Sequence, residues 1–205
     1  MDASFYFWYA AALEREGRFD KAEKLFMKCL ELDPQHAEAY NYLAYMWAEK
    51  GIKLDQAFKY ITKALKLNQK SGAFLDTLGW IYYMNEQYKE ALEQVNHAAE
   101  IIPDDPTILD HLGDIFFKLG DEKQAIPYWE KSFVLDPGNG KVAEKLSRYG
   151  VDLEPLRKQA EELKADRKNG DKTDPSATTG SPALLISPLP VLETDGPQPE
   201  IDPAE

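Results

Sequence analysis

Apolar residues recur at intervals of three and four along most of the chain, and the same pattern returns after about 34 residues. Four segments show this repeat most plainly: FDKAEKLFMKCLELDP, LDQAFKYITKALKLNQ, YKEALEQVNHAAEIIP and EKQAIPYWEKSFVLDP. They align on Ala22, Ala57, Ala91 and Ala125, which are separated by 35, 34 and 34 residues. The spacing predicts amphipathic helices rather than strands.

A second matching stretch precedes each of these segments, in the order FWYAAALEREG, YLAYMWAEKG, TLGWIYYMNEQ and HLGDIFFKLG. The pattern therefore predicts that each unit consists of two helices joined by a short turn at a Gly or polar break. One position of the first helix always holds a small residue that lets neighbouring helices approach closely: Ala10, Ala44, Gly79 and Gly113. A proline ends the second helix of three units, at Pro34, Pro103 and Pro137.

These residues resemble the tetratricopeptide repeat, whose units of about 34 residues carry the pattern W-x2-L-G-x2-Y, then A-x3-F, then P. The resemblance is to bacterial arrays, and it implies an all-α, right-handed α-solenoid of about four helix hairpins. The predicted units are residues 3–36, 37–71, 72–105 and 106–139. The second unit departs from the pattern, because Gln69 replaces its proline and one extra residue lies in its turn.

The residues after the fourth unit change in character twice. Residues 140–167 continue the helical periodicity with charged surroundings, so we expect capping helices that cover the last repeat. Residues 168–205 are rich in Pro and acidic residues, and we expect this tail to be disordered. Its apolar stretch ALLISPLPVL, residues 183–192, is either a chance patch in a linker or a short docking motif.

Five aromatic residues in succession, FYFWY at residues 5–9, open the first predicted helix. A helix turns by about 100° per residue, so these rings cannot all point into one core. We expect Tyr6 and Tyr9 to pack inside the first unit and Phe5 to face outward, where a preceding repeat would lie. Upstream repeats of a longer array, a homodimer contact, or simple tolerance of an exposed ring would each account for Phe5.

Charge and composition narrow the classes of partner. The chain has 24 Lys and Arg against 36 Asp and Glu, a formal net charge of −12, which disfavours nucleic-acid binding. No apolar run approaches the roughly 20 residues of a spanning helix, so we expect no membrane insertion. Cys29 is the only cysteine, which excludes an internal disulfide and a CxxC site. The compartment stays open between a bacterial cytoplasm and the cell envelope.

The sequence lacks the signatures of catalysis, since GxSxG, HExxH and GxxxxGK are all absent. We therefore expect no enzyme activity, no cofactor and no metal site. Asp110 and Asp114 share a helix face with His111 between them, and we interpret this group as a solvated face rather than a metal site.

The resemblance implies that the first helix of each unit lines a concave groove that binds partner peptides. By position, the predicted groove residues are Phe7, Trp8, Asn41, Tyr42, Tyr45, Asp76, Thr77, Trp80, Tyr83, Asp110, His111, Asp114 and Phe117. Such a groove is aromatic and acidic, so we expect a protein or peptide partner with apolar or aromatic groups and basic residues. The Lys and Arg clamp that some family members use for a terminal carboxylate is missing.

The sequence thus predicts a protein-interaction scaffold. Two alternatives stay open at this point. The chain could be the non-catalytic targeting or regulatory arm of a longer enzyme, or its own tail could dock into the groove.

Overall fold

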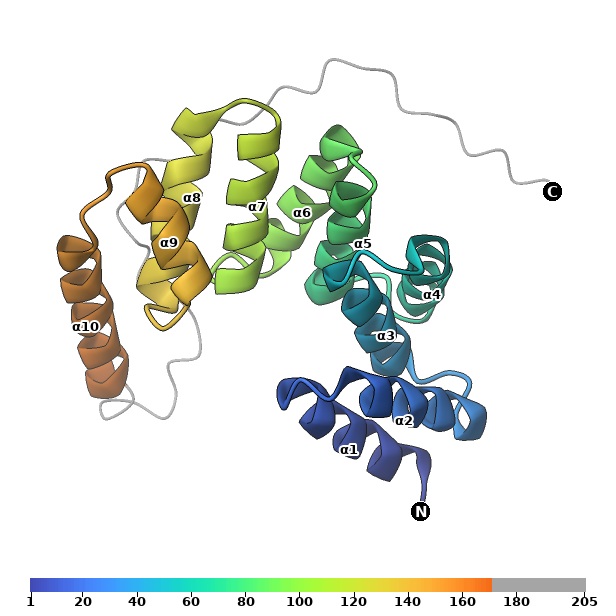
Figure 1. The fold of residues 1–205 in the computed structure, drawn as a ribbon. Helices are drawn as coiled ribbons and strands as arrows, with labels where there is room; N and C mark the ends of the chain where they lie inside the picture. Colours follow the sequence, from blue (N-terminus) through green and yellow to red (C-terminus); the bar gives the residue numbers. More distant parts are fainter. Residues whose placement is uncertain (171–205) are drawn as a thin grey trace. The chain divides into compact units, whose positions relative to one another are not determined.

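The computed structural model describes residues 1–170 and folds them into ten α-helices without a strand in that range (Figure 1). The helices are α1 (Ala3–Arg15), α2 (Phe19–Leu32), α3 (Ala37–Glu49), α4 (Leu54–Leu67), α5 (Gly72–Met84), α6 (Tyr88–Ile101), α7 (Pro106–Lys118), α8 (Glu122–Leu135), α9 (Gly140–Arg148) and α10 (Leu153–Gly170). The predicted tail comprises residues 168–205. Its first three residues belong to α10, and the rest, with the apolar stretch at 183–192, lies outside the described residues.

The first helix of each unit starts at a side chain that bonds one or two of its first free amides. The Asp2 carboxylate accepts from the Phe5 amide at 2.9 Å, and the Asp105 carboxylate accepts from the Thr107 amide at 2.8 Å. Pro106 follows Asp105 at the first helical position, where its missing amide costs no hydrogen bond. Local sequence therefore fixes where α1 and α7 begin.

The turn between the two helices of each unit uses the left-handed backbone region. Gly17, Gly51 and Gly120 adopt φ values of 72°, 63° and 82° at corresponding positions. The third unit places Glu86 there instead, with φ 62°. A Cβ atom makes this conformation unfavourable, so the third turn carries backbone strain at Glu86. The second turn carries similar strain at Lys53, which follows Gly51 with φ 51°.

The helices pair into hairpins, and the hairpins stack in sequence order (Figure 1). Within the hairpins α1 packs on α2, α3 on α4, α5 on α6 and α7 on α8. Between hairpins α2 packs on α3, α4 on α5 and α6 on α7. Among the first helices, α3 also contacts α5, and α5 contacts α7. The aligned alanines that reveal the repeat are all fully buried: Ala22, Ala57, Ala91 and Ala125. This arrangement confirms the predicted α-solenoid.

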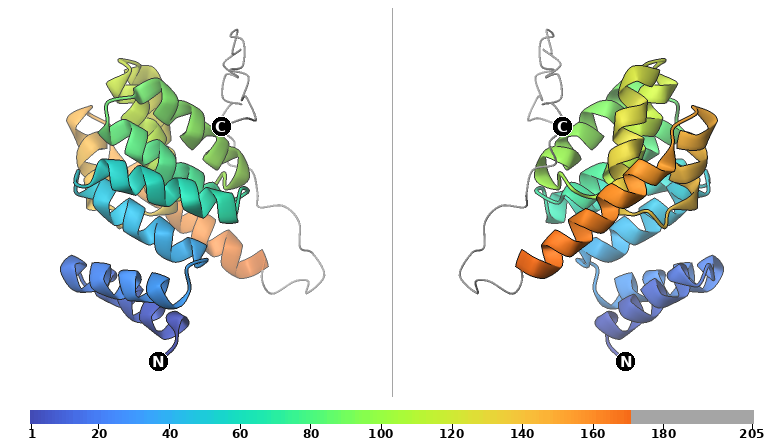
Figure 2. Two further views of the ribbon diagram at one scale, coloured as in Figure 1. Left: turned by 90° about the vertical axis from the view of Figure 1, so that its right-hand side faces the viewer. Right: turned by 90° about the vertical axis from the view of Figure 1, so that its left-hand side faces the viewer.

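The last hairpin is covered by further helix, as predicted. Helix α9 packs on α8, and its Val142 and Leu146 are fully buried in the same apolar cluster as α7 and α8. Leu153 and Leu156 of α10 are partly buried against that cluster. Figure 2 shows α8, α9 and α10 from two sides, in yellow to orange. The C-terminal end of the array therefore has its apolar face covered.

Candidate functional site

The first helices of the four units line a hollow with a volume of about 400 Å³. Its lining comes from α1, α3, α5 and the start of α7: Glu14, Asn41, Tyr42, Tyr45, Ala73, Asp76, Thr77, Asp105, Thr107 and Ile108. Five of the predicted groove residues meet here, namely Asn41, Tyr42, Tyr45, Asp76 and Thr77. The other predicted groove residues lie outside this lining.

Hydrogen-bond acceptors and negative charge dominate the hollow. Burial raises the pKa of the Tyr45 hydroxyl well above its usual range, and the carboxylates of Glu49, Asp76 and Glu14 raise this pKa further. Burial also raises the pKa of Glu14. The Asn41 Oδ1 atom is buried without a hydrogen-bond partner among the described residues. A ligand that donates hydrogen bonds therefore suits this lining better than one that accepts them.

Trp80 and Tyr83 of α5 form a ring stack with His111 of α7 instead of standing free in a groove. The Trp80 ring lies 4.5 Å from the Tyr83 ring and 4.0 Å from the His111 ring, with interplanar angles of 7° and 13°. Trp80 is only 9% exposed, whereas Tyr83 is partly exposed. This stack joins the third unit to the fourth, and Trp80 presents little surface to a partner.

His111 also pairs with Asp76 across the same boundary between units. Its Nδ1 atom lies 2.8 Å from Asp76 Oδ1, and both side chains are buried. Burial alone would lower the pKa of His111, but the facing Asp76 carboxylate outweighs burial and raises it. His111 therefore lies inside the protein, which differs from the solvated face expected from the sequence.

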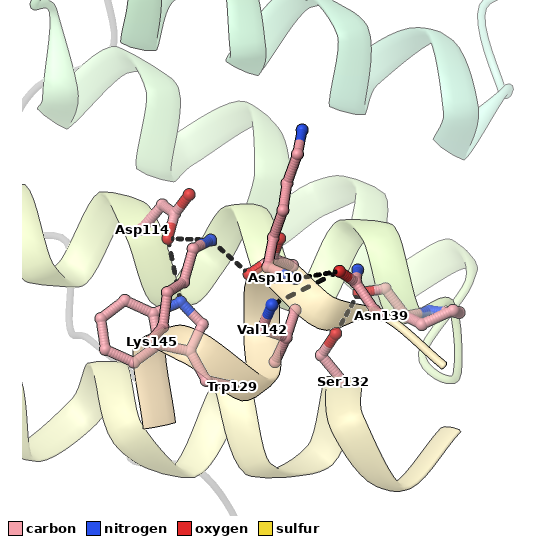
Figure 3. Close-up of polar contacts among 9 residues, drawn as sticks. Asp110, Asp114, Trp129, Ser132, Asn139, Val142 and Lys145 are labelled. Carbon is pink, nitrogen blue, oxygen red and sulfur yellow. Dashed lines mark hydrogen bonds and ion pairs between the residues drawn. The ribbon is translucent and has the colours of Figure 1, made fainter. Parts of the chain in front are cut away.

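Asp110 and Asp114 are engaged by a lysine from the capping region (Figure 3). The Lys145 Nζ atom lies 2.7 Å from Asp110 Oδ1 and also pairs with Asp114. The Trp129 indole donates to Asp114 Oδ1 at 2.9 Å, and Lys145 Nζ lies 5.6 Å from the Trp129 ring centre. Burial, with Asp114 nearby, raises the pKa of Asp110. This pair is likewise not the solvated face that the sequence suggested.

Replacing Lys145 by Met should lower the free energy of unfolding by about 1–3 kcal/mol, because two largely buried carboxylates would lose their shared cation. Lys141→Met in the same helix is the control, since Lys141 is exposed and forms no ion pair within the described residues. Urea denaturation followed by circular dichroism measures both variants. Equal stability of the two variants would show that the Lys145 contacts contribute little.

The aromatic run of α1 is oriented differently from the prediction. Phe7 is only 6% exposed, because its ring stacks on His36 at 4.6 Å and meets the edge of Tyr42. Trp8 is exposed, as is Tyr9, which the sequence placed inside its own unit. The expectation for Tyr9 is wrong, because none of the helices α2 to α10 packs on the face of α1 that Tyr9 occupies. Phe117 is exposed and lies near Trp129 and Tyr149 at the capping end.

Five lining residues of the hollow are not among the predicted groove residues: Glu14, Ala73, Asp105, Thr107 and Ile108. Glu14 follows the small residue Ala10 by four positions, as Tyr83 follows Gly79. If the position four residues after the small residue had been assigned to the groove in every unit, Glu14 would have been identified. Asp105 carries the ordinary signal of a helix N-cap, so nothing in the sequence marks its second role.

The described residues offer no cluster of three or more His, Cys, Asp or Glu side chains that could hold a metal ion. In the same part of the chain, each helix is too short or too polar to cross a bilayer.

Comparison with known proteins agrees with the repeat pattern. Residues 3–46 and 106–139 match family models of the tetratricopeptide repeat. Human mitochondrial import receptor subunit TOM70 is 27% identical over 99 residues, which cover 48% of this chain and 16% of the receptor. Pseudomonas aeruginosa type IV pilus assembly protein PilF is 28% identical over 133 residues, covering 63% of this chain and 52% of PilF. The chain thus spans about half of PilF and a far smaller part of TOM70.

Solved structures show the same fold. PilF from Pseudomonas aeruginosa superposes with a TM-score of 0.60 at 23% identity, covering 82% of this chain and 73% of PilF. The first repeat domain of Spaghetti (RPAP3), bound to the HSP90 peptide SRMEEVD, gives a TM-score of 0.53 at 18% identity, covering 58% of this chain and 94% of that domain. Repeats of this type mediate protein interactions. The family matches, together with the stacked hairpins, show that the chain is a tetratricopeptide repeat protein.

Proposed function

We propose that this chain is a protein-interaction scaffold that binds an extended or helical partner segment in the hollow lined by α1, α3, α5 and α7. The observation that carries the proposal is the hollow itself, which brings side chains of four successive units around one space of about 400 Å³. Tyr42 and Tyr45 supply aromatic surface there, and such residues often anchor partners. RPAP3 binds a peptide on the same fold, which supports the choice of ligand class.

The lining favours a partner with basic residues among apolar or aromatic ones. Glu14, Asp76 and Asp105 contribute carboxylates, and the hollow's lining includes neither Lys nor Arg. Asp76 is paired with His111 and Asp105 caps α7, so Glu14 is the carboxylate of the lining without an ion pair or capping bond within the described residues. Lys145 supports the same conclusion, because a neighbouring part of this face already accommodates an ammonium group between Asp110 and Asp114. A partner ammonium or guanidinium group would find acceptors, whereas a carboxylate would meet like charge.

The expected ligand therefore differs from the acidic peptide bound to RPAP3, whose sequence SRMEEVD ends in Glu, Glu, Val and Asp. The fourth unit contributes less of the site than the sequence suggested. Asp110 and Asp114 are engaged by Lys145, and His111 is paired with Asp76. We place the partner along the first three units and the start of α7.

Selection from a phage library of random peptides of about ten residues tests this proposal. We expect the full chain to enrich peptides that combine Lys or Arg with aromatic residues. Tyr45→Ala should weaken the affinity of an enriched peptide at least about tenfold, because it removes an aromatic side chain that lines the hollow. Fluorescence anisotropy of the labelled peptide measures the affinity.

Phe58→Ala is the matched control, since Phe58 is an exposed aromatic residue on the second helix α4 and lies outside the hollow. It should leave the affinity unchanged. Enrichment of acidic peptides, or equal loss of affinity in both variants, would contradict the proposed site.

A further inference from the structure

The outer face of α1 carries an apolar stripe that no helix of the described chain covers. Phe5 is 46% exposed and Tyr9 is 48% exposed, and Ala12 continues the stripe one turn further as an exposed residue. Trp8, next to the stripe, is 67% exposed. These residues lie three and four positions apart, so they share one side of the helix.

The same three repeat positions are covered in every later unit. Equivalent positions are counted from the small residue of each first helix, which is Ala10, Ala44, Gly79 or Gly113. In α1, Phe5 lies five positions before this residue, Tyr9 lies one position before it and Ala12 lies two positions after it. The equivalent residues are Ala39, Leu43 and Met46 in α3, Phe74, Leu78 and Ile81 in α5, and Ile108, Leu112 and Ile115 in α7. All of these are buried except Leu78, which is partly buried.

The covering element in the later units is the second helix of the preceding hairpin. Helix α2 packs on α3, α4 on α5 and α6 on α7. Aromatic contacts cross these boundaries, such as Phe26 with Tyr42 at 5.1 Å and Phe58 with Tyr82 at 5.8 Å. The α1 stripe is therefore the fourth copy of a surface whose other three copies all bind an amphipathic helix.

We infer that the stripe formed by Phe5, Tyr9 and Ala12 is a docking surface for an amphipathic helix that resembles α2, α4 and α6 and belongs to a segment outside residues 1–170. A second copy of the chain fits less well. Helices α2, α4, α6 and α8 each already pack on the helix that follows. The remaining helix, α10, exposes mostly charged residues such as Arg157, Lys158 and Glu161, so the described residues of a copy offer no free apolar equivalent. Pairing of two α1 helices alone would also fall far short of the roughly 20–30 residues per side of a standard interface.

An added hairpin tests this inference on the full chain. A copy of residues 72–105, which comprises α5, α6 and the linker before α7, replaces Met1 and Asp2 and leads directly into Ala3. This junction places the added α6 before α1 as the natural α6 stands before α7. We expect amide hydrogen exchange in α1 to slow at least about tenfold in the fusion protein, because the terminal helix would gain a covering neighbour.

Tyr9→Glu, introduced in α1 of the fusion protein, should abolish this protection, since it places a charge in the covered stripe. The same substitution in the parent chain should leave the fold intact, because Tyr9 is exposed there. Unchanged α1 exchange in a folded fusion protein would overturn the inference. Sedimentation of the parent chain provides the second readout, where a monomer is expected. A dimer that Tyr9→Glu dissociates would identify a second copy as the occupant and would also overturn it.

Discussion

Replacing Gly113 by Ala is expected to lower the free energy of unfolding by about 3 kcal/mol, at the upper end of the range for overpacked cores. A Cβ atom at this position would lie 2.4 Å from both Cδ1 and Nε1 of Trp129. The Trp129 ring cannot move aside easily, because it is buried and its Nε1 donates to Asp114. The added methyl group would therefore push α7 away from α8.

Gly140→Ala is the matched control for this substitution. A Cβ atom at Gly140, the first residue of α9, would have open space around it. Alanine favours the helix more than glycine does, so this variant should be neutral or slightly more stable. Urea denaturation of both variants gives the comparison. A Gly113→Ala protein as stable as the parent would mean that α7 and α8 are not packed as closely as the structure has them.

Replacing His111 by Ala is expected to lower the free energy of unfolding by about 3–5 kcal/mol, because it leaves the Asp76 carboxylate buried without its partner. The substitution also removes the ring that stacks on Trp80 at 4.0 Å. His97→Ala is the control, since His97 is exposed on α6.

The His111 effect should also depend on pH in a defined direction. The folded-state pKa of His111 is raised above its usual value, because the facing Asp76 carboxylate outweighs burial. A raised folded-state pKa gives stability that is complete below the unfolded-state pKa of about 6.5 and is lost as pH rises through the folded-state value. The stability difference between the parent and His111→Ala should thus be largest near pH 6 and shrink toward alkaline pH. A difference that grows with pH would contradict a charged pair.

The fold could be predicted from the sequence because one register recurs four times. Each copy places a fully buried alanine in the second helix of its hairpin, and the stacking of equal units then follows from the need to bury equal faces. The covering of the last hairpin could be predicted for the same reason, since Val142 and Leu146 continue the apolar pattern. The array therefore follows from local patterns repeated at a fixed distance.

The candidate site could be predicted only in part. Asn41, Tyr45 and Asp76 line the hollow as the repeat register suggests. The positions of Trp80 and His111 depend on the angle between neighbouring units, which turns these side chains toward each other across the boundary between α5 and α7. A repeat pattern specifies which face of a helix a residue occupies, but not whether the next unit closes over that face.

Lys145 illustrates a second limit of the sequence pattern. Lys145 lies in α9, after the four repeat units. The repeat pattern predicts that Asp110 and Asp114 face a groove, but it does not predict that a lysine from α9 pairs with them. The cation that this acidic pair shares is brought to it by the packing of α9 on α8.

Amide chemical shift changes on titration with a selected basic peptide test the central claim most directly. The account predicts that the largest changes occur at residues lining the hollow, with Asn41, Tyr45, Asp76 and Thr107 among them. Changes confined to the second helices, such as those around Phe58 in α4 or Leu92 in α6, would place the partner on another face and contradict the account.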